Sequence, residues 1–155
     1  MRLFLVTLLL IHGLLSQHAM MPNPALTPGA TDPAVTQETI HQTICKPGYT
    51  ATVRSVPESV NRAVMKRYNL PESDLHLVEI DHLYSLELAG SNSIDNLWPE
   101  YYDPAPGQVG YLGARDKDVV ETWLHRKICN GDMTLTAAQQ AIRTWPKWYQ
   151  KIKSR

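Results

Sequence analysis

Residues 77–99 read LVEIDHLYSLELAGSNSIDNLWP, and the rest of the fold is organised around this stretch. It begins with an apolar run and continues into the acid–histidine pair Asp81 and His82. A turn of small residues follows at Ala89–Gly90, and Asn96 precedes a Leu-Trp-Pro segment. A short apolar run that ends in ionisable side chains and is followed by a Gly/Asn-containing turn predicts a strand with polar groups at its end.

Hydrophobic periodicity extends this prediction along the chain. We expect residues 75–80 to form one strand and residues 85–88 a second short strand, joined as an antiparallel hairpin. The alternating run YTATV at residues 49–53 predicts a further strand. Apolar stripes at helical spacing and cap-like residues predict four helices: 34–43, 57–68, 114–129 and one that begins at Thr134 or Thr136 and ends at Pro146.

The N-terminus has the composition of a targeting segment. Arg2 precedes the leucine-rich residues 3–15, and the small residue Ala19 follows closely, which is the layout of a secretory signal peptide over residues 1–19. The run is shorter than the ~20 apolar residues that a membrane span requires. We therefore expect a secreted or periplasmic protein without membrane attachment after cleavage; the alternatives are an uncleaved anchor and a buried helix.

The remaining chain is long enough for one domain. Residues 20–33 contain four prolines and little apolar periodicity, which predicts a Pro-rich linker. Residues 34–146 then form the single domain. Residues 147–155, KWYQKIKSR, form a basic C-terminal tail that is either frayed in solvent or able to hold a phosphate backbone between its aromatic and cationic side chains.

Cysteine usage agrees with export. Cys45 and Cys129 are the two cysteines of the chain, and such a pair tends to form a disulfide in an oxidising compartment. The alternative is two buried free thiols. Because the sequence contains no Cys-x-x-Cys pair, a cysteine-based zinc knuckle is excluded.

Charge and motif content narrow the function classes. The chain has 15 Lys and Arg residues and 15 Asp and Glu residues, which is not the composition of a protein that coats nucleic acid. A local basic patch remains compatible with this balance. The sequence has no glycine-rich phosphate loop, no Gly-x-Ser-x-Gly and no His-Glu-x-x-His, so those hydrolase classes have no support.

Asp81 and His82 are the residues best suited to chemistry. Hydrolysis of a phosphodiester requires a base that activates water, a cation that neutralises charge, and a scaffold that holds both. Asp81 offers oxygen donors suited to Mg²⁺, and His82 titrates near neutrality. Both can serve one site only where the strand ends or bulges. A further ligand would come from the helix at 114–129, with His125 as first choice and Glu121, four residues earlier on the same face, as second. The alternative is a hydrogen-bonded pair at a strand end.

The run DHLYSLELAGSNSIDNLWPE, followed by KDVVETWLHRKIC and TLTAAQQAI, resembles the HNH endonucleases of the ββα-metal fold. Within about residues 31–144 it is also similar to a group of small exported bacterial proteins with an HNH-like core. The resemblance implies an α+β fold in which a short antiparallel hairpin and flanking helices surround the site. The family's paired glycine is Ala89–Gly90 here, and the spacing from Asn96 to His125 exceeds the family's usual spacing.

The resemblance also implies a role for each matching residue. Asp81 would bind metal, His82 would activate water as the catalytic base, and Asn96 would fix the loop between the strands. His125 would complete the metal site, with Glu121 or Asp118 as its replacement. A disulfide between the two cysteines would brace the end of the third helix.

The function implied is an exported nuclease that hydrolyses phosphodiester bonds of DNA or RNA with Mg²⁺ or Mn²⁺, or alternatively Zn²⁺. Nucleic acid is the expected partner, and we expect it to contact Lys117, Arg126 and Lys127. The alternative is a non-catalytic secreted binding or structural protein that retains an HNH-like fold. The zero net charge favours this alternative, since nucleases usually need a positive track for the backbone.

Overall fold

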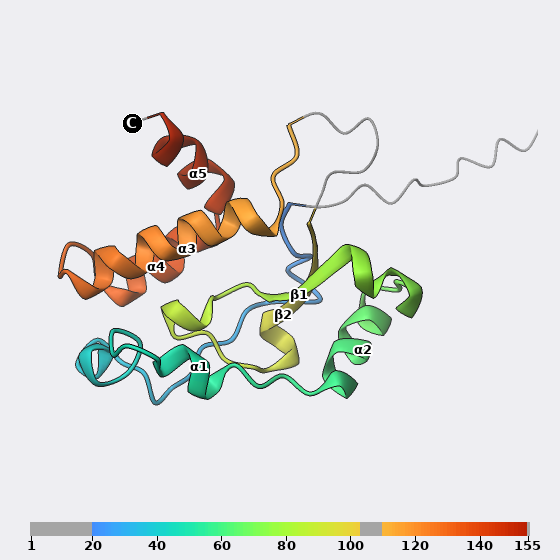
Figure 1. The fold of residues 1–155 in the computed structure, drawn as a ribbon, viewed down its shortest axis with the longest axis horizontal. Helices are drawn as coiled ribbons and strands as arrows, with labels where there is room; N and C mark the ends of the chain where they lie inside the picture. Colours follow the sequence, from blue (N-terminus) through green and yellow to red (C-terminus); the bar gives the residue numbers. More distant parts are fainter. Residues whose placement is uncertain (1–19, 103–109, 155) are drawn as a thin grey trace, which may run out of the picture.

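The structure, a computed structural model, describes residues 20–102 and 110–154. The described part is a mixed α+β arrangement that contains a two-stranded antiparallel sheet (Figure 1). The predicted signal peptide, residues 1–19, lies outside the described residues, as do residues 103–109 and residue 155. The strands are β1 (Val78–His82) and β2 (Leu97–Tyr101), and the helices are α1 (Tyr49–Val53), α2 (Glu58–Arg67), α3 (Ala114–Cys129), α4 (Leu135–Ile142) and α5 (Trp145–Lys153).

The hairpin differs from the predicted one in its second strand. β2 is the partner of β1, with Asp81 opposite Trp98 and His82 opposite Leu97. The prediction of a strand at residues 85–88 was wrong, because Leu86–Leu88 form a 3₁₀ turn. The turn buries Leu86 and Leu88. In a strand these two side chains would also share one face, opposite Glu87, so the alternating pattern did not distinguish a strand from this turn. The connection between the strands therefore spans residues 83–96.

The YTATV segment is helix α1 and not a strand. The Tyr49 amide bonds Lys46 O at 3.1 Å, and the Thr52 hydroxyl donates to Tyr49 O at 2.7 Å, so local bonds satisfy the backbone. A strand also needs a partner, and the strands of the described residues, β1 and β2, pair with each other. Alternating composition alone was therefore a misleading signal at this segment.

Helix α3 confirms the apolar stripe predicted from the sequence. Val120, Leu124 and Ile128 are fully buried and follow each other at intervals of four residues. They pack with α4 and α5 on one side of the molecule, where α3 and α4 run side by side (Figure 1). The buried residues of this helical core are Val35, Ile40, Ile44, Leu88, Ala89, Val120, Leu124, Ile128, Leu135, Ala138, Ala141, Ile142 and Trp145.

A second, smaller core lies between α2 and the hairpin. Met65 of α2 packs with Val78 of β1 and Tyr101 of β2, and each of these side chains is buried. The helical core includes Leu88 and Ala89 of the loop between the strands. Helix α2 therefore packs against the strands, whereas the helical layer packs against the loop.

Both segments that flank the predicted domain belong to it. Residues 20–33 pack along the hairpin loop: Thr27 is fully buried, its hydroxyl donates to Leu97 O at 2.9 Å, and Thr31 forms a β-bridge with Gly90. They are therefore not a free linker. At the other end, Pro146 does not end a helix. It occupies the first turn of α5, where a missing amide proton is tolerated, and α5 packs against α3.

Cys45 and Cys129 form a disulfide with a Cα–Cα distance of 5.5 Å. The bond ties the segment before α1 to the last residue of α3. Disulfides of this kind form and persist in oxidising compartments. In the described parts of the chain, no helix combines the length and the apolar composition needed to cross a bilayer.

Loss of this bond should destabilise the protein strongly. The bond closes a loop with a sequence separation of 84 residues. We expect the double variant Cys45→Ser, Cys129→Ser to lose about 4 kcal/mol of unfolding free energy, since the reduced unfolded chain regains loop entropy. Urea unfolding followed by circular dichroism measures this loss. Dithiothreitol should destabilise the wild type by a similar amount and leave the double variant unchanged; equal sensitivity of both proteins would contradict the expectation.

Candidate functional site

A pocket of about 790 Å³ opens beside β1 and is lined by residues from α2, β1, the hairpin loop and α3. Asp81 and His82, the last residues of β1, both line it. The strand ends there, so two neighbouring side chains reach one site. The wall is rich in carboxylates, which are contributed by Glu58, Glu79, Asp81, Glu87, Asp118 and Glu121.

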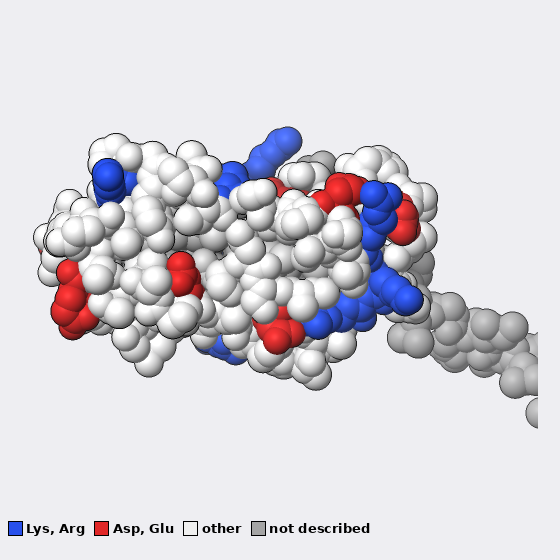
Figure 2. Space-filling view, turned by 90° about the horizontal axis from the view of Figure 1, so that it is seen from below, with Lys and Arg blue, Asp and Glu red and all other residues white. Residues whose placement is uncertain are grey.

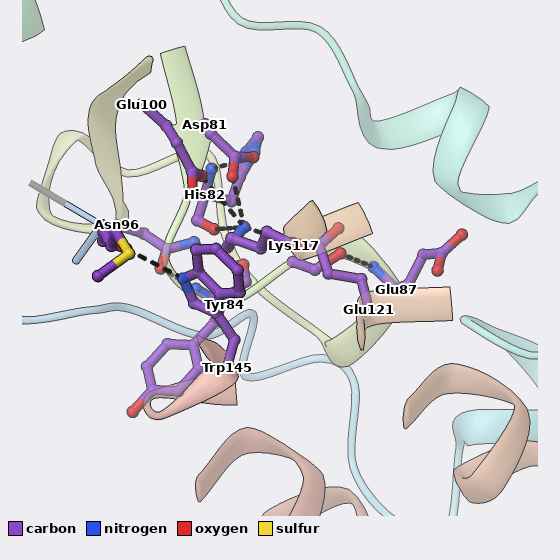
Figure 3. Close-up of polar contacts among 11 residues, drawn as sticks. Asp81, His82, Tyr84, Glu87, Asn96, Glu100, Lys117, Glu121 and Trp145 are labelled. Atoms are coloured by element: carbon purple, nitrogen blue, oxygen red, sulfur yellow. Dashed lines mark hydrogen bonds and ion pairs between the residues drawn. The ribbon is translucent and has the colours of Figure 1, made fainter. Parts of the chain in front are cut away.

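Lys117 of α3 lies at the base of this site and joins α3 to β1. Its ammonium forms ion pairs with Asp81 and with Glu121, and it donates a third hydrogen bond to His82 O at 2.9 Å. Figure 3 shows the Lys117 nitrogen between these groups. The side chain is 1% exposed, so its three donors meet three acceptors away from water.

The charges of this cluster set the pKa values of its members. Burial acts to lower the pKa of Lys117, but the Asp81 and Glu121 carboxylates outweigh it and raise that pKa well above the ordinary value. Burial likewise acts to raise the pKa of Asp81, but the Lys117 ammonium outweighs it and holds the pKa below the ordinary value. Burial raises the pKa of Glu121 to about 7. Lys117 and Asp81 are therefore both charged at neutral pH.

Glu100 of β2 completes the cluster. Its side chain is 0% exposed, and its carboxyl lies 3.9 Å from Lys117 Nζ. Burial raises the pKa of Glu100 well above its ordinary value, and the neighbouring Asp81 carboxylate raises it further, while the Lys117 ammonium acts in the opposite direction. The Lys117 ammonium therefore supplies positive charge to this group of carboxyls without any added ion.

His82 is held by Asn92 of the hairpin loop. Asn92 Nδ2 donates to Val53 O at 2.7 Å and to Ser55 O at 3.3 Å, which turns Asn92 Oδ1 towards the imidazole. Oδ1 lies 2.8 Å from His82 Nε2, so this nitrogen carries the hydrogen. Burial lowers the pKa of His82, which keeps the ring neutral and leaves Nδ1 with its lone pair.

Asn96 holds the loop and does not line the pocket. It is fully buried. Its Oδ1 accepts from Tyr84 N at 2.9 Å, and its Nδ2 donates to Tyr84 O and to Ser91 O at 2.9 Å each. Gly90 lies in the same loop, and a Cβ there would collide with the Tyr84 carbonyl, so the close packing of the loop requires glycine.

The structure does not bring His125 to Asp81. His125 Nε2 lies 2.8 Å from Ile44 O, beside the disulfide and one helical turn beyond Glu121. Its Nδ1 lies 4.0 Å from a Glu87 carboxylate oxygen. Of the three helix residues considered for the site, Glu121 is the one that shares the partner Lys117 with Asp81, and Asp118 lines the same pocket. The first choice of His125 is therefore corrected.

The donor set at Asp81 does not fit a divalent ion as it stands. Asp81 and Glu121 offer oxygen donors, but both carboxylates are engaged by the Lys117 ammonium. Within residues 20–102 and 110–154, the group of three potential ligands that lie close enough to share an ion is Cys45, His125 and Cys129. Its cysteines form the disulfide, so they offer no thiolate ligands.

The expected nucleic-acid contacts are only partly available. Lys117 is buried in the cluster and cannot contact a phosphate backbone, which corrects that prediction. Lys127 of α3 forms an ion pair with Asp132 at 2.9 Å, and Arg126 is exposed. Among the described residues that line the pocket, Arg54 is the one Lys or Arg, and it is exposed.

Sequence reasoning missed three residues of the site, Arg54, Asn92 and Glu100, and it gave Lys117 the role of a nucleic-acid contact instead of its place in the buried cluster. A signal for Lys117 was present, since it lies four residues before Glu121 on the same helical face. The spacing of Glu121 and His125 was the same, so spacing alone did not discriminate between the two pairs. The other three residues reach the site through pairing and loop packing that leave no local pattern.

Comparison with known proteins gave no match: no family model, no curated protein and no solved structure matches the chain.

Stability should depend on pH through Glu121. The folded protein keeps this carboxyl protonated up to about pH 7, whereas a free glutamate releases its proton near its ordinary pKa of 4.5. Between these pH values the folded state binds more protons, so its contribution to stability is full below pH 4.5 and is lost as the pH rises through about 7.

Glu121→Gln should therefore flatten the decline of unfolding free energy between about pH 5 and pH 7. Chemical denaturation at a series of pH values measures the slope. Glu72→Gln is the matched control, because the Glu72 side chain is 62% exposed and should leave the slope unchanged. An unchanged slope in Glu121→Gln would show that another group titrates.

Proposed function

We propose that the chain is an exported phosphodiester hydrolase of the HNH-like type, acting on DNA or RNA. The observation that carries the proposal is that His82, at the end of β1, and Glu121 of α3 both line one pocket. The order β1, β2, α3 is also the order of a ββα arrangement. The Cys45–Cys129 disulfide supports the secreted or periplasmic location.

His82 is suited to be the general base. Its Nε2 hydrogen is directed to Asn92, so Nδ1 is the atom that takes a proton from water. The lowered pKa keeps the ring in the proton-accepting form at neutral pH. The water oxygen would then attack phosphorus as its proton moves to Nδ1.

Glu121 is suited to be the general acid. A carboxyl with a pKa of about 7 holds a proton at physiological pH and can release it to the departing oxygen. The pocket thus contains a base with a lowered pKa and an acid with a raised pKa, an arrangement typical of acid–base catalysis. In this scheme one phosphorus–oxygen bond forms and one breaks, and the proton count balances between His82 and Glu121.

Arg54 supplies positive charge to the substrate. Its guanidinium acts electrostatically on His82, Glu79 and Asp118, which places it at the pocket wall. An arginine offers two parallel donors to a phosphate. Elsewhere the charges are interspersed: on the face in Figure 2, basic and acidic side chains lie among a mostly uncharged surface. This pattern favours recognition of one phosphodiester at the pocket over a long basic track.

Replacement of His82 should abolish hydrolysis. We expect His82→Ala to lower kcat by at least ~100-fold on plasmid DNA or on bis(p-nitrophenyl) phosphate, since the base is removed. In the wild type, kcat should rise with pH through a pKa below the ordinary histidine value, as His82 loses its proton, and fall again as Glu121 loses its proton with a pKa of about 7. His76→Ala is the matched control, because His76 does not line the pocket. Full activity in His82→Ala would contradict the role of His82 as the general base.

Asn92 should act as a positioning residue. Asn92→Ala removes the acceptor that fixes the imidazole, and we expect kcat to fall by ~10-fold or more with little change in KM. Asn92→Asp keeps an acceptor and adds a negative charge, which stabilises the imidazolium and moves the rising limb of the pH profile to higher pH. A merely structural role for Asn92 would leave the pH profile of both variants where it is in the wild type.

The alternative is a non-catalytic secreted protein that binds its partner with this surface. The buried Lys117 cluster favours it, because buried ion pairs also serve structural roles alone. Absence of hydrolysis in the wild type, with DNA, RNA and the small phosphodiester, would favour this alternative.

A further inference from the structure

An HNH-like hydrolase needs positive charge beside the phosphate that it cleaves. In metal-dependent hydrolysis an ion bound by carboxylates neutralises charge beside the scissile group. In this chain the carboxylates that face each other at the site are Asp81 and Glu121, and a side chain of the same protein lies between them. The cation of the site is therefore covalently part of α3.

We infer that the Lys117 ammonium permanently occupies the cation position between Asp81 and Glu121, so that the site binds no divalent ion there and works without one. The statement about activity rests on the proposed hydrolase function. The statement about ion binding rests only on the geometry of the cluster and is tested separately.

The hydrogen-bond count supports this inference. An ammonium has three donors, and Lys117 directs them to Asp81, Glu121 and the His82 carbonyl. An ion bound to the same two carboxylates would require oxygen contacts of about 2.0–2.6 Å, which leaves no room for the ammonium. Lys117 would have to leave a site in which it is 1% exposed, and its donors would then lose all three acceptors.

The position of Lys117 on the backbone also supports it. Lys117 and Glu121 are one turn apart on α3, so both approach Asp81 from the same rigid helix. Glu100 of β2 is fully buried, and its carboxyl lies 3.9 Å from the ammonium. The ammonium is thus enclosed by three carboxyl groups from β1, β2 and α3, and it holds these elements in register.

The charge balance leads to the same conclusion. Despite the burial of Asp81, the Lys117 ammonium holds the pKa of that carboxyl below its ordinary value, whereas burial raises the pKa of Glu100 well above its own. A divalent ion in addition to the ammonium would leave excess positive charge in a buried site, and this is costly. An ion in place of the ammonium would displace the Lys117 side chain, which would lose its hydrogen bonds to Asp81, Glu121 and the His82 carbonyl.

Calorimetric titration with Mn²⁺ tests ion binding directly. For the wild-type full chain we expect no saturable binding at this site. Lys117→Ala opens the position and leaves both carboxylates in place, so we expect one Mn²⁺ per chain to bind and to raise the melting temperature. Lys117→Met fills the space without charge and is the control that should bind no ion. Lys117→Ala combined with Asp81→Asn should lose the binding that the single variant gains.

Hydrolysis of bis(p-nitrophenyl) phosphate tests the consequence for activity. We expect EDTA to change the wild-type rate by less than about twofold, whereas Lys117→Ala should require added Mn²⁺ for any activity. Loss of wild-type activity in EDTA with recovery in Mg²⁺ or Mn²⁺ would overturn the inference. Saturable Mn²⁺ binding by the wild type that Asp81→Asn removes would overturn it as well.

The two proposals fail in different ways. A wild type that hydrolyses nothing in any buffer, and that also binds no Mn²⁺, overturns the hydrolase proposal and supports the inference on the cation position. If Lys117→Ala does not fold, the wild-type titration and the EDTA comparison still decide the matter, since neither requires a variant.

Discussion

The buried ammonium of Lys117 is the interaction on which the site depends. Asp81 ends β1, Glu121 lies on α3 and Glu100 lies on β2, and a single side chain holds the three carboxyl groups together. Three acid groups in a buried space repel one another when ionised, so without a cation they would have to protonate or separate. One lysine removes this conflict and thereby fixes the hairpin against the helix.

The long hairpin loop depends on a second set of buried polar contacts. Asn96 joins the start of the loop at Tyr84 to its later part at Ser91, and it does so entirely through backbone groups. This arrangement carries Asn92 to the imidazole of His82. The folded loop thus holds Asn92 in the position from which it orients the imidazole of His82.

Sequence reasoning succeeded where a local pattern has a local cause. The stripe of Val120, Leu124 and Ile128 predicted α3 with its bounds, because helix periodicity and burial act on the same few residues. It failed for residues 85–88 and 49–53, since alternation describes a strand only where a partner strand is present. Tertiary context offered no such partner to either segment.

The sequence by itself determined that Asp81 and His82 end a strand, that α3 has one buried face, and that the two cysteines were available to pair. Only the tertiary structure decided that Glu121 and not His125 faces Asp81, and that Lys117 lies between them. The physical reason is that helix spacing gives several residues the same face. Which of them meets the strand depends on how the helix is placed against the hairpin, and the packing of α3 with α4 and α5 sets that placement.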